Sequence, residues 1–347
     1  MQTIQWKTGT AYDFFVSLTV LHKPAIFGLR PSWAAGVRQR VPAVKREFLE
    51  KILSFSGVPL KWLSGLPEPG DASTAFKAIE DLSPIERLGS LTLVAETTPD
   101  VRECLQTIAR RGSWMDTEIK ILKEQYSLRD SSLSPESLGK LVSTWAEPEK
   151  SSELFLEALL DYYQVFFAEE ETRIRPALLS GLDHAQELAT RMSLEGLIEN
   201  LSHGVRFAPL ESTVEFILVP SYWCYPLIFY ARLAPGKLLL LFGARPEFES
   251  IVPGAGPSPQ LVNILKTLAD PTRLRILRFL ASQPLSSTEL AHLLRLRLPT
   301  VTHHLRSLRL SGLVQITVGE TEKRYATRLE ILDGLQQMLG NFIRTKE

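Results

Sequence analysis

The last quarter of the chain, residues 261–347, places the strongest constraint on the fold. It contains three short segments in which apolar residues recur at helical spacing, and then two segments that alternate around a glycine-containing turn. Helical spacing and strand alternation are different periods, so this order predicts three helices followed by a β-hairpin. A module of this kind is small and compact, and it encloses its own apolar core.

Residues that start and stop helices support the same order. Asp270 is expected to cap a helix that Pro271 opens, because the missing N–H of proline costs nothing in the first turn. Ser286 or Ser287 is expected to cap the next helix, with Glu289 early in it, where the helix dipole favours a negative charge. The middle of the module is therefore predicted to be two helices joined by a turn.

The third segment, 299–310, is predicted to be a recognition helix that Pro299 opens and Gly312 ends. At about 100° per residue, Val301, Leu305 and Leu308 share one face and pack inward. The rest of the helix carries small polar or cationic side chains that suit hydrogen bonding in a DNA major groove. The candidate DNA-binding residues on this helix are Thr300, Thr302, His303, Arg306 and Ser307.

The hairpin after this helix is predicted to form a wing. Its strands are Val314–Val318 and Lys323–Thr327. Lys323 and Arg324 complete the candidate DNA-binding set, since cations on a wing can contact the phosphate backbone. Glu320 and Glu322, in contrast, would be repelled by phosphate.

This helix, helix, helix, hairpin order resembles the ArsR family of winged helix-turn-helix repressors. The resemblance is carried by Leu268 to Leu277, Glu289-Leu290-Ala291, Pro299 to Leu305 and Ser311-Gly312-Leu313-Val314. It implies a DNA-binding transcriptional regulator, a repressor that binds operator DNA as a homodimer. A stripe on the last helix is expected either to pair with its twin or to dock on the N-terminal part; it comprises Ile331, Leu335, Met338, Leu339 and Phe342.

The sequence departs from the family pattern in its turn and in its metal site. Arg295 and Arg297 occupy the turn positions where the family has glycine and a Ser or Thr cap, so a strained turn or additional phosphate contacts are expected. No cysteine lies within 261–347, so the thiolate motif of the metal-sensing members is absent. A site built from His292, His303 and His304 is disfavoured, because adjacent histidines face different ways on a helix. We expect no metal and no cofactor.

Charge is distributed unevenly along the chain. Residues 261–347 hold 13 lysines and arginines against 7 aspartates and glutamates, an excess of six positive charges. The chain as a whole is neutral, with 39 residues of each sign, so residues 1–260 carry an excess of six negative charges. A basic module on an acidic body is typical of nucleic-acid binding, although an imbalance of solvated charges gives the same count.

Residues 1–250 are predicted to form a large helical body with a small β-sheet, and 251–260, rich in proline and glycine, a linker. The fold class is thus mainly α with minor β, with the winged helix-turn-helix at 261–347. Helical spacing occurs at 43–53, 138–145, 154–167 and 184–201, whereas 214–219, 237–242 and 224–230 are predicted strands. No long apolar run and no signal region occur, so we expect a soluble cytoplasmic protein without a membrane partner.

The body shows no phosphate loop, nucleophile elbow or zinc-binding helix pair, so we expect no enzyme activity. Glu169 to Glu171, followed by Arg173 and Arg175, is predicted to be an exposed charged face. Two aromatic groups indicate either a pocket for a small-molecule effector or an ordinary core with a dimer interface. They are Tyr162, Tyr163, Phe166 and Phe167, and Trp223, Tyr225, Phe229 and Tyr230.

Parts of the body also resemble a long N-terminal domain of unassigned role that is fused to ArsR-type winged helices in some bacterial regulators. The residues concerned are Tyr12 to Leu18, His22-Lys23-Pro24, Phe27 to Ala34 and Leu218 to Ser221. Two other functions stay open beside DNA binding. One is an enzymatic or ligand-binding body that uses the winged helix for targeting, and the other is a winged helix that binds protein.

Overall fold

The computed structural model describes residues 2–27, 29–68, 70–93, 97–127, 134–207, 215–225, 227–245, 259–318 and 322–344. Residues 251–258 of the predicted linker, and Glu320 of the wing, lie outside the described residues. No helix in the described part of the chain is both long and apolar enough to cross a membrane.

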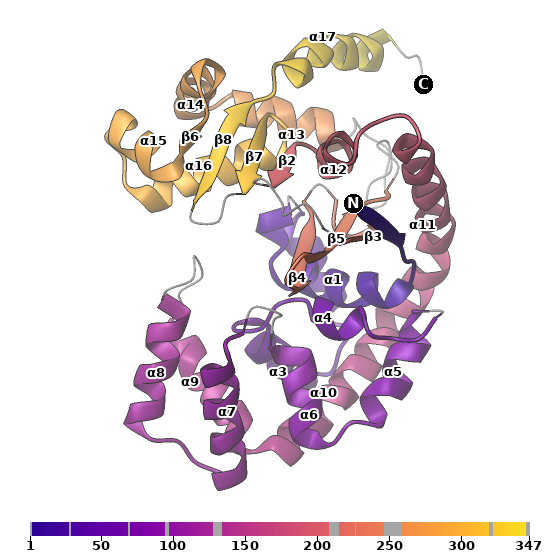
Figure 1. Ribbon diagram of the computed structural model, residues 1–347, viewed down its shortest axis with the longest axis vertical. Coiled ribbons are helices and arrows are strands. Elements are labelled where there is room, and N and C mark those ends of the chain that lie inside the picture. Colours follow the sequence, from indigo (N-terminus) through magenta and orange to yellow (C-terminus); the bar gives the residue numbers. More distant parts are fainter. Residues whose placement is uncertain are drawn as a thin grey trace.

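The N-terminal body is predominantly helical, as predicted, and most of its helices lie in the lower part of the molecule in Figure 1. Its first helices are α1 (Thr10–His22), α2 (Pro31–Arg38), α3 (Ala43–Leu53), α4 (Leu60–Leu63), α5 (Ala72–Glu80) and α6 (Pro84–Thr92), with a 3-10 turn at Pro24–Phe27. The later ones are α7 (Pro99–Arg111), α8 (Asp116–Ser127), α9 (Pro135–Ala146), α10 (Pro148–Tyr162), α11 (Ala168–Ala189) and α12 (Leu194–Leu201). A π-helical turn, Tyr163–Phe167, joins α10 to α11.

The body also contains a four-stranded mixed sheet in the order β1-β3-β5-β4. Its strands are β1 (Thr3–Trp6), β3 (Glu215–Ser221), β4 (Phe229–Ala234) and β5 (Lys237–Gly243). β1, β3 and β5 run parallel, and β4 pairs with β5 in the antiparallel direction. The predicted strands at 214–219 and 237–242 are confirmed as β3 and β5. β1 has only four residues, too few for a clear pattern, and was not predicted.

The third predicted strand, 224–230, is wrong in position, because β4 begins at Phe229. Asp13 of α1 explains the difference. Its carboxylate accepts hydrogen bonds from the Ser221 hydroxyl (2.7 Å) and from the backbone N–H groups of Tyr222 (3.2 Å) and Trp223 (2.8 Å). These bonds hold the chain after β3 in a turn, so it cannot continue as a strand.

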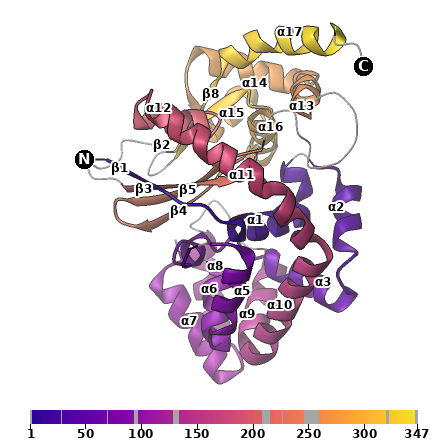
Figure 2. The same cartoon turned by 90° about the vertical axis from the view of Figure 1, so that its right-hand side faces the viewer.

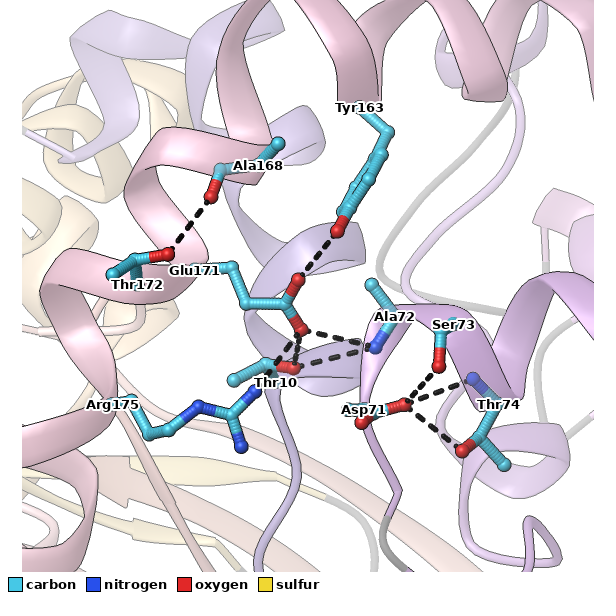
Figure 3. A network of polar contacts seen from close by, with 10 residues as sticks. All are labelled: Thr10, Asp71, Ala72, Ser73, Thr74, Tyr163, Ala168, Glu171, Thr172 and Arg175. Carbon is cyan, nitrogen blue, oxygen red and sulfur yellow. Dashed lines mark hydrogen bonds and ion pairs between the residues drawn. The ribbon is translucent and has the colours of Figure 1, made fainter.

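The predicted exposed face at Glu169 to Glu171 is corrected at Glu171, whose carboxylate is buried (Figure 3). It accepts hydrogen bonds from the hydroxyl of Thr10 and from that of Tyr163 (2.8 Å), and the backbone N–H of Ala72 lies 3.3 Å away. Glu171 lies three and seven residues before the buried Ile174 and Leu178, so it belongs to the inward stripe of α11. The glutamate therefore ties α1, α5 and α11 together.

The C-terminal module has the predicted order. Its elements are α13 (Pro259–Leu268), α14 (Pro271–Ser282), β6 (Leu285–Ser286), α15 (Ser287–Leu294), α16 (Leu298–Leu310), β7 (Val314–Val318), β8 (Lys323–Thr327) and α17 (Leu329–Arg344). β7 and β8 form the predicted antiparallel hairpin, with Val314 opposite Thr327 and Val318 opposite Lys323. This arrangement is a winged helix-turn-helix, and it forms the upper part of the molecule in Figure 1.

A short strand of the body extends the sheet of the wing. β2 (Val205–Phe207) pairs in parallel with β7, which gives the order β2-β7-β8-β6. A strand edge that would be open in an isolated winged helix is thereby covered. Figure 2 shows α11 and α12 crossing the body and leading to β2 beside the wing.

Apolar packing continues across the same junction. Ile316 of β7 is buried in one cluster with Leu197 of α12 and Phe216 of β3. The winged helix has a second core of its own, which includes Ile276, Leu290 and Leu305. The body and the winged helix are therefore joined by a shared core and by a shared sheet.

Candidate nucleic-acid interface

Helix caps fix the first two helices of the helix-turn-helix as the sequence predicts. The Asp270 carboxylate accepts hydrogen bonds from the N–H groups of Thr272 (2.8 Å) and Arg273 (3.0 Å) at the start of α14. At the start of α15, Ser286 accepts from the N–H of Glu289 (3.2 Å), and Glu289 accepts from the N–H of Ser286 (2.7 Å). Ser286, rather than Ser287, is thus the cap, and the reciprocal pair is a capping box.

The two faces of α16 are confirmed. Val301, Leu305 and Leu308 are buried in the core of the winged helix. On the outside, Thr300, Thr302, His303 and Arg306 are exposed, whereas Ser307 is half-buried. The helix begins at Leu298, one residue before the predicted start, and Pro299 lies in its first turn.

The polar side chains of α16 differ in what they already bond. The hydroxyl of Thr302 donates to the carbonyl of Leu298 (2.9 Å), and that of Ser307 donates to the carbonyl of His303 (3.2 Å). Each hydroxyl oxygen can still accept a hydrogen bond from a base or a water molecule. The Arg306 guanidinium has no hydrogen bond or ion pair among the described residues, so all its donors are available to DNA.

The turn between α15 and α16 carries the predicted irregularity. Arg295 ends α15 in the left-handed region, with φ 56° and ψ 43°. Arg297 takes the cap position of α16 but makes no side-chain capping bond. Both side chains are exposed, so the turn presents two cations beside the N-terminus of α16, where the helix dipole also favours an anion.

The positive charge of the wing is balanced by carboxylates of the same module to a greater extent than the sequence predicts. Arg324 forms ion pairs with Glu322 (2.7 Å) and Glu289 (3.6 Å), and it donates to the carbonyl of Pro284 (3.3 Å). Lys323 is half-buried at the first position of β8. A phosphate contact by Arg324 would have to compete with two carboxylates, so α16 and its turn offer the more available cations.

Arg309 is a half-buried arginine of α16 that was not among the predicted site residues. Burial lowers the pKa of its guanidinium, and Tyr325 of β8 and Tyr230 of β4 lie close enough to oppose this shift. The position does carry a sequence signal. It is an arginine one residue after the buried Leu308, so it borders the inward face of α16. The buried guanidinium of Arg309 therefore lies on the side of α16 that packs against β7.

The histidines of the module do not gather around a common point. His303 is exposed and His304 is half-buried, with ring centroids 6.0 Å apart. Burial lowers the pKa of the His304 ring from its ordinary value. Within the described residues, no group of three or more His, Cys, Asp or Glu side chains is arranged to hold a metal ion.

Comparison with known proteins places the similarity on this same interface. A family model described as bacterial regulatory protein, arsR family, matches residues 270–315, from the cap of α14 into β7. The arsenical resistance operon repressor of Staphylococcus xylosus is 35% identical over 80 residues, which make up 23% of this chain and 77% of that relative. The family model therefore covers the helix-turn-helix, and the stretch shared with the relative makes up less than a quarter of this chain.

Proposed function

Because this chain belongs to the ArsR family of bacterial regulatory proteins and is a DNA-binding regulator, we propose that it represses transcription by binding a two-fold symmetric operator as a homodimer. The observation that carries the proposal is α16. Its apolar residues are buried, and its outer face presents Thr300, Thr302, His303 and Arg306. Repression is proposed because the relative from Staphylococcus xylosus is itself described as a repressor.

The proposed contacts divide into two kinds. Arg306 and His303 lie on the exposed face of α16, where side chains reach base edges in the major groove. Arg295 and Arg297 lie in the preceding turn, where a phosphate would meet their cations and the N-terminus of α16. Base contacts carry specificity, whereas phosphate contacts carry affinity that depends on salt.

The test is fluorescence anisotropy with an operator duplex selected from the host genome, measured over a range of salt concentrations. Arg306→Ala is expected to weaken binding by roughly 5- to 150-fold, corresponding to about 1–3 kcal/mol. The matched control is Arg110→Ala, which removes an exposed arginine from α7, remote from the winged helix in Figure 1. Equal affinity of the Arg306→Ala variant and the wild type would overturn the proposed interface.

A homodimer is proposed through α13 and α17. Ile331, Leu335 and Met338 of α17 pack on the core of their own winged helix, so that part of the predicted stripe is already covered. Large apolar side chains nevertheless stay exposed on both helices, with Leu265 41%, Leu329 55% and Ile343 71% accessible. Exposed apolar residues on adjoining helices favour a subunit interface.

Sedimentation velocity tests the dimer directly. Leu265→Glu is expected to shift the full chain from dimer to monomer and to weaken operator binding. Leu179→Glu on α11 is the control, because it changes another exposed leucine. A wild type that sediments as a monomer at the concentrations where it binds the operator would refute the dimer.

The body is proposed to transmit a signal to the winged helix rather than to catalyse a reaction. Support comes from the pairing of β2 with β7 and from the cluster in which Ile316 is buried with Leu197 and Phe216. A change in the body that shifts either contact changes the population of the DNA-competent state. The carboxylates that look most like catalytic groups, Asp13 and Glu171, are already used to hold a turn and three helices.

A further inference from the structure

Two loops of the body meet at the carboxyl ends of the parallel strands β3 and β5. Ser221 and Gly243 are paired at these ends, and the N–H of Ala244 donates to the carbonyl of Ser221 (2.9 Å). Tyr222 directly follows β3, and Arg245 follows β5 by two residues. In open sheets with parallel strands, ligands bind just outside this edge.

Cations and aromatic rings alternate there in a group that we call the arginine–tyrosine stack: Arg173, Tyr222, Arg245, Tyr225 and His203. The guanidinium carbon of Arg245 lies 4.8 Å from the ring centroid of Tyr225 and 5.8 Å from that of Tyr222. Arg173 of α11 lies 4.7 Å from the Tyr222 ring and donates to its hydroxyl (2.8 Å). Two guanidinium groups thus share one tyrosine ring.

The two arginines differ in how their charge is balanced. Arg173 pairs with Glu170 at 2.7 Å. Arg245 has no carboxylate partner among the described residues, and its guanidinium donates only one long hydrogen bond, to the carbonyl of Tyr225 (3.4 Å). The structure describes no acceptor for its buried Nε among the residues that it places, and burial lowers the pKa of the guanidinium. A partly desolvated cation without an anion is costly unless a ligand supplies one.

The loop that carries the stack is held in place before any ligand arrives. Asp13 binds Ser221, Tyr222 and Trp223 together, as described above. The Trp223 ring packs in the core of the body, on Trp33 and Phe166, and anchors the loop further. A fixed loop suits a ligand that brings an acceptor for Arg245, since little ordering is needed when it binds.

The stack leads directly to the wing. The ring of His203 meets that of Tyr225 edge to face, with centroids 5.0 Å apart. The next residue, Gly204, accepts a hydrogen bond at its carbonyl from the N–H of Ile316 in β7 (2.8 Å). Tyr225 and His203 therefore link the Arg245 guanidinium to the strand pairing that joins the body to the winged helix.

We propose that the arginine–tyrosine stack binds a small organic carboxylate through Arg245, and that this ligand is the effector of the regulator. The effector role rests on the proposed function, but the binding site does not. A planar carboxylate matches the edge of one guanidinium that lies between aromatic rings. A phosphate dianion would require more positive charge than Arg245 alone supplies, because Arg173 is already paired.

The binding site is tested without DNA, by thermal unfolding of the full chain in sodium benzoate, with sodium chloride and inorganic phosphate at equal ionic strength. Benzoate is expected to raise Tm saturably, and Arg245→Gln is expected to weaken that effect at least tenfold. Arg110→Gln on α7 is the control. The proposal is wrong if benzoate acts no better than chloride, if phosphate stabilises more strongly than benzoate, or if Arg245→Gln responds like the wild type.

If the Arg245→Gln variant does not fold, a second measurement tests the site on the wild type. Hydrogen exchange of the wild type with benzoate is expected to show new protection at residues 222–225 and 203–205, and protection elsewhere contradicts the site. The effector role is then tested by operator affinity, which benzoate is expected to change at least threefold. If benzoate binds but operator affinity does not change, the effector role is wrong and the binding site stands. If benzoate binds but the protein does not bind duplex DNA, the proposed function is wrong and the binding site still stands.

Discussion

Replacing Arg295 by glycine should stabilise the helix-turn-helix and weaken DNA binding at the same time. Arg295 holds φ 56° and ψ 43°, a conformation that costs a non-glycine residue about 1–2 kcal/mol. Glycine removes that cost but loses about 0.5–1 kcal/mol more chain entropy on folding. The expected net gain is about 0.5–1 kcal/mol, because no side-chain hydrogen bond of Arg295 is lost among the described residues.

The assay is amide hydrogen exchange of α15 and α16 in the full chain, which reports local opening. Arg295→Gly should slow exchange there by about two- to fivefold, since about 1.4 kcal/mol corresponds to a factor of ten. Arg295→Ala is the matched variant: it removes the same charge but keeps the strained φ, so exchange should not slow. Both variants should lose operator affinity equally. Faster exchange in Arg295→Gly than in Arg295→Ala would refute the strain argument.

Three further predictions concern the junction, the buried carboxyl and the core. Gly204→Ala should destabilise the pairing of β2 with β7 by about 1–3 kcal/mol, because a Cβ at a φ of 91° would lie 2.8 Å from Cδ of Arg328. Hydrogen exchange of the β7 amides measures this change, and an unchanged exchange rate would contradict the prediction. Burial raises the pKa of Asp13 to about 6, above its ordinary 3.8, so its contribution to stability falls as pH rises through this window. The stability difference between the wild type and Asp13→Asn should therefore change between about pH 4 and 6 and be flat above, and a difference that is flat throughout would count against the shift. Leu305→Ala should cost about 2–5 kcal/mol in urea unfolding, whereas exposed Leu293→Ala should cost far less.

The winged helix could be predicted closely because its information is local. Caps such as Asp270, the αL glycine Gly312 and the inward triplet of α16 each act within a few residues, and the structure has them where expected. The shift of the third strand to Phe229 could not be predicted. It depends on Asp13, more than 200 residues away in the sequence, which bonds the turn after β3.

The pairing of the body with the wing could not be predicted either, because it also depends on residues that are distant in the sequence. β2 has three residues and pairs with a strand more than 100 residues later. Arg245 and Arg173 likewise lie far apart in the chain and meet only on the ring of Tyr222. From the sequence, the two aromatic groups could belong either to an ordinary core or to a ligand pocket. In the structure most of them are core residues, namely Tyr162, Phe166, Phe167 and Trp223. Tyr225, in contrast, lies partly exposed beside Arg245.

The most direct test of DNA recognition by α16 is the base preference of the full chain, measured by sequencing duplexes that it retains from a randomised pool. The wild type should enrich two half-sites related by two-fold symmetry. Arg306→Ala should relax the preference at one symmetric pair of positions and leave the others intact, because a base contact carries local specificity. An unchanged preference in Arg306→Ala, or no enrichment by the wild type, would contradict recognition through this helix.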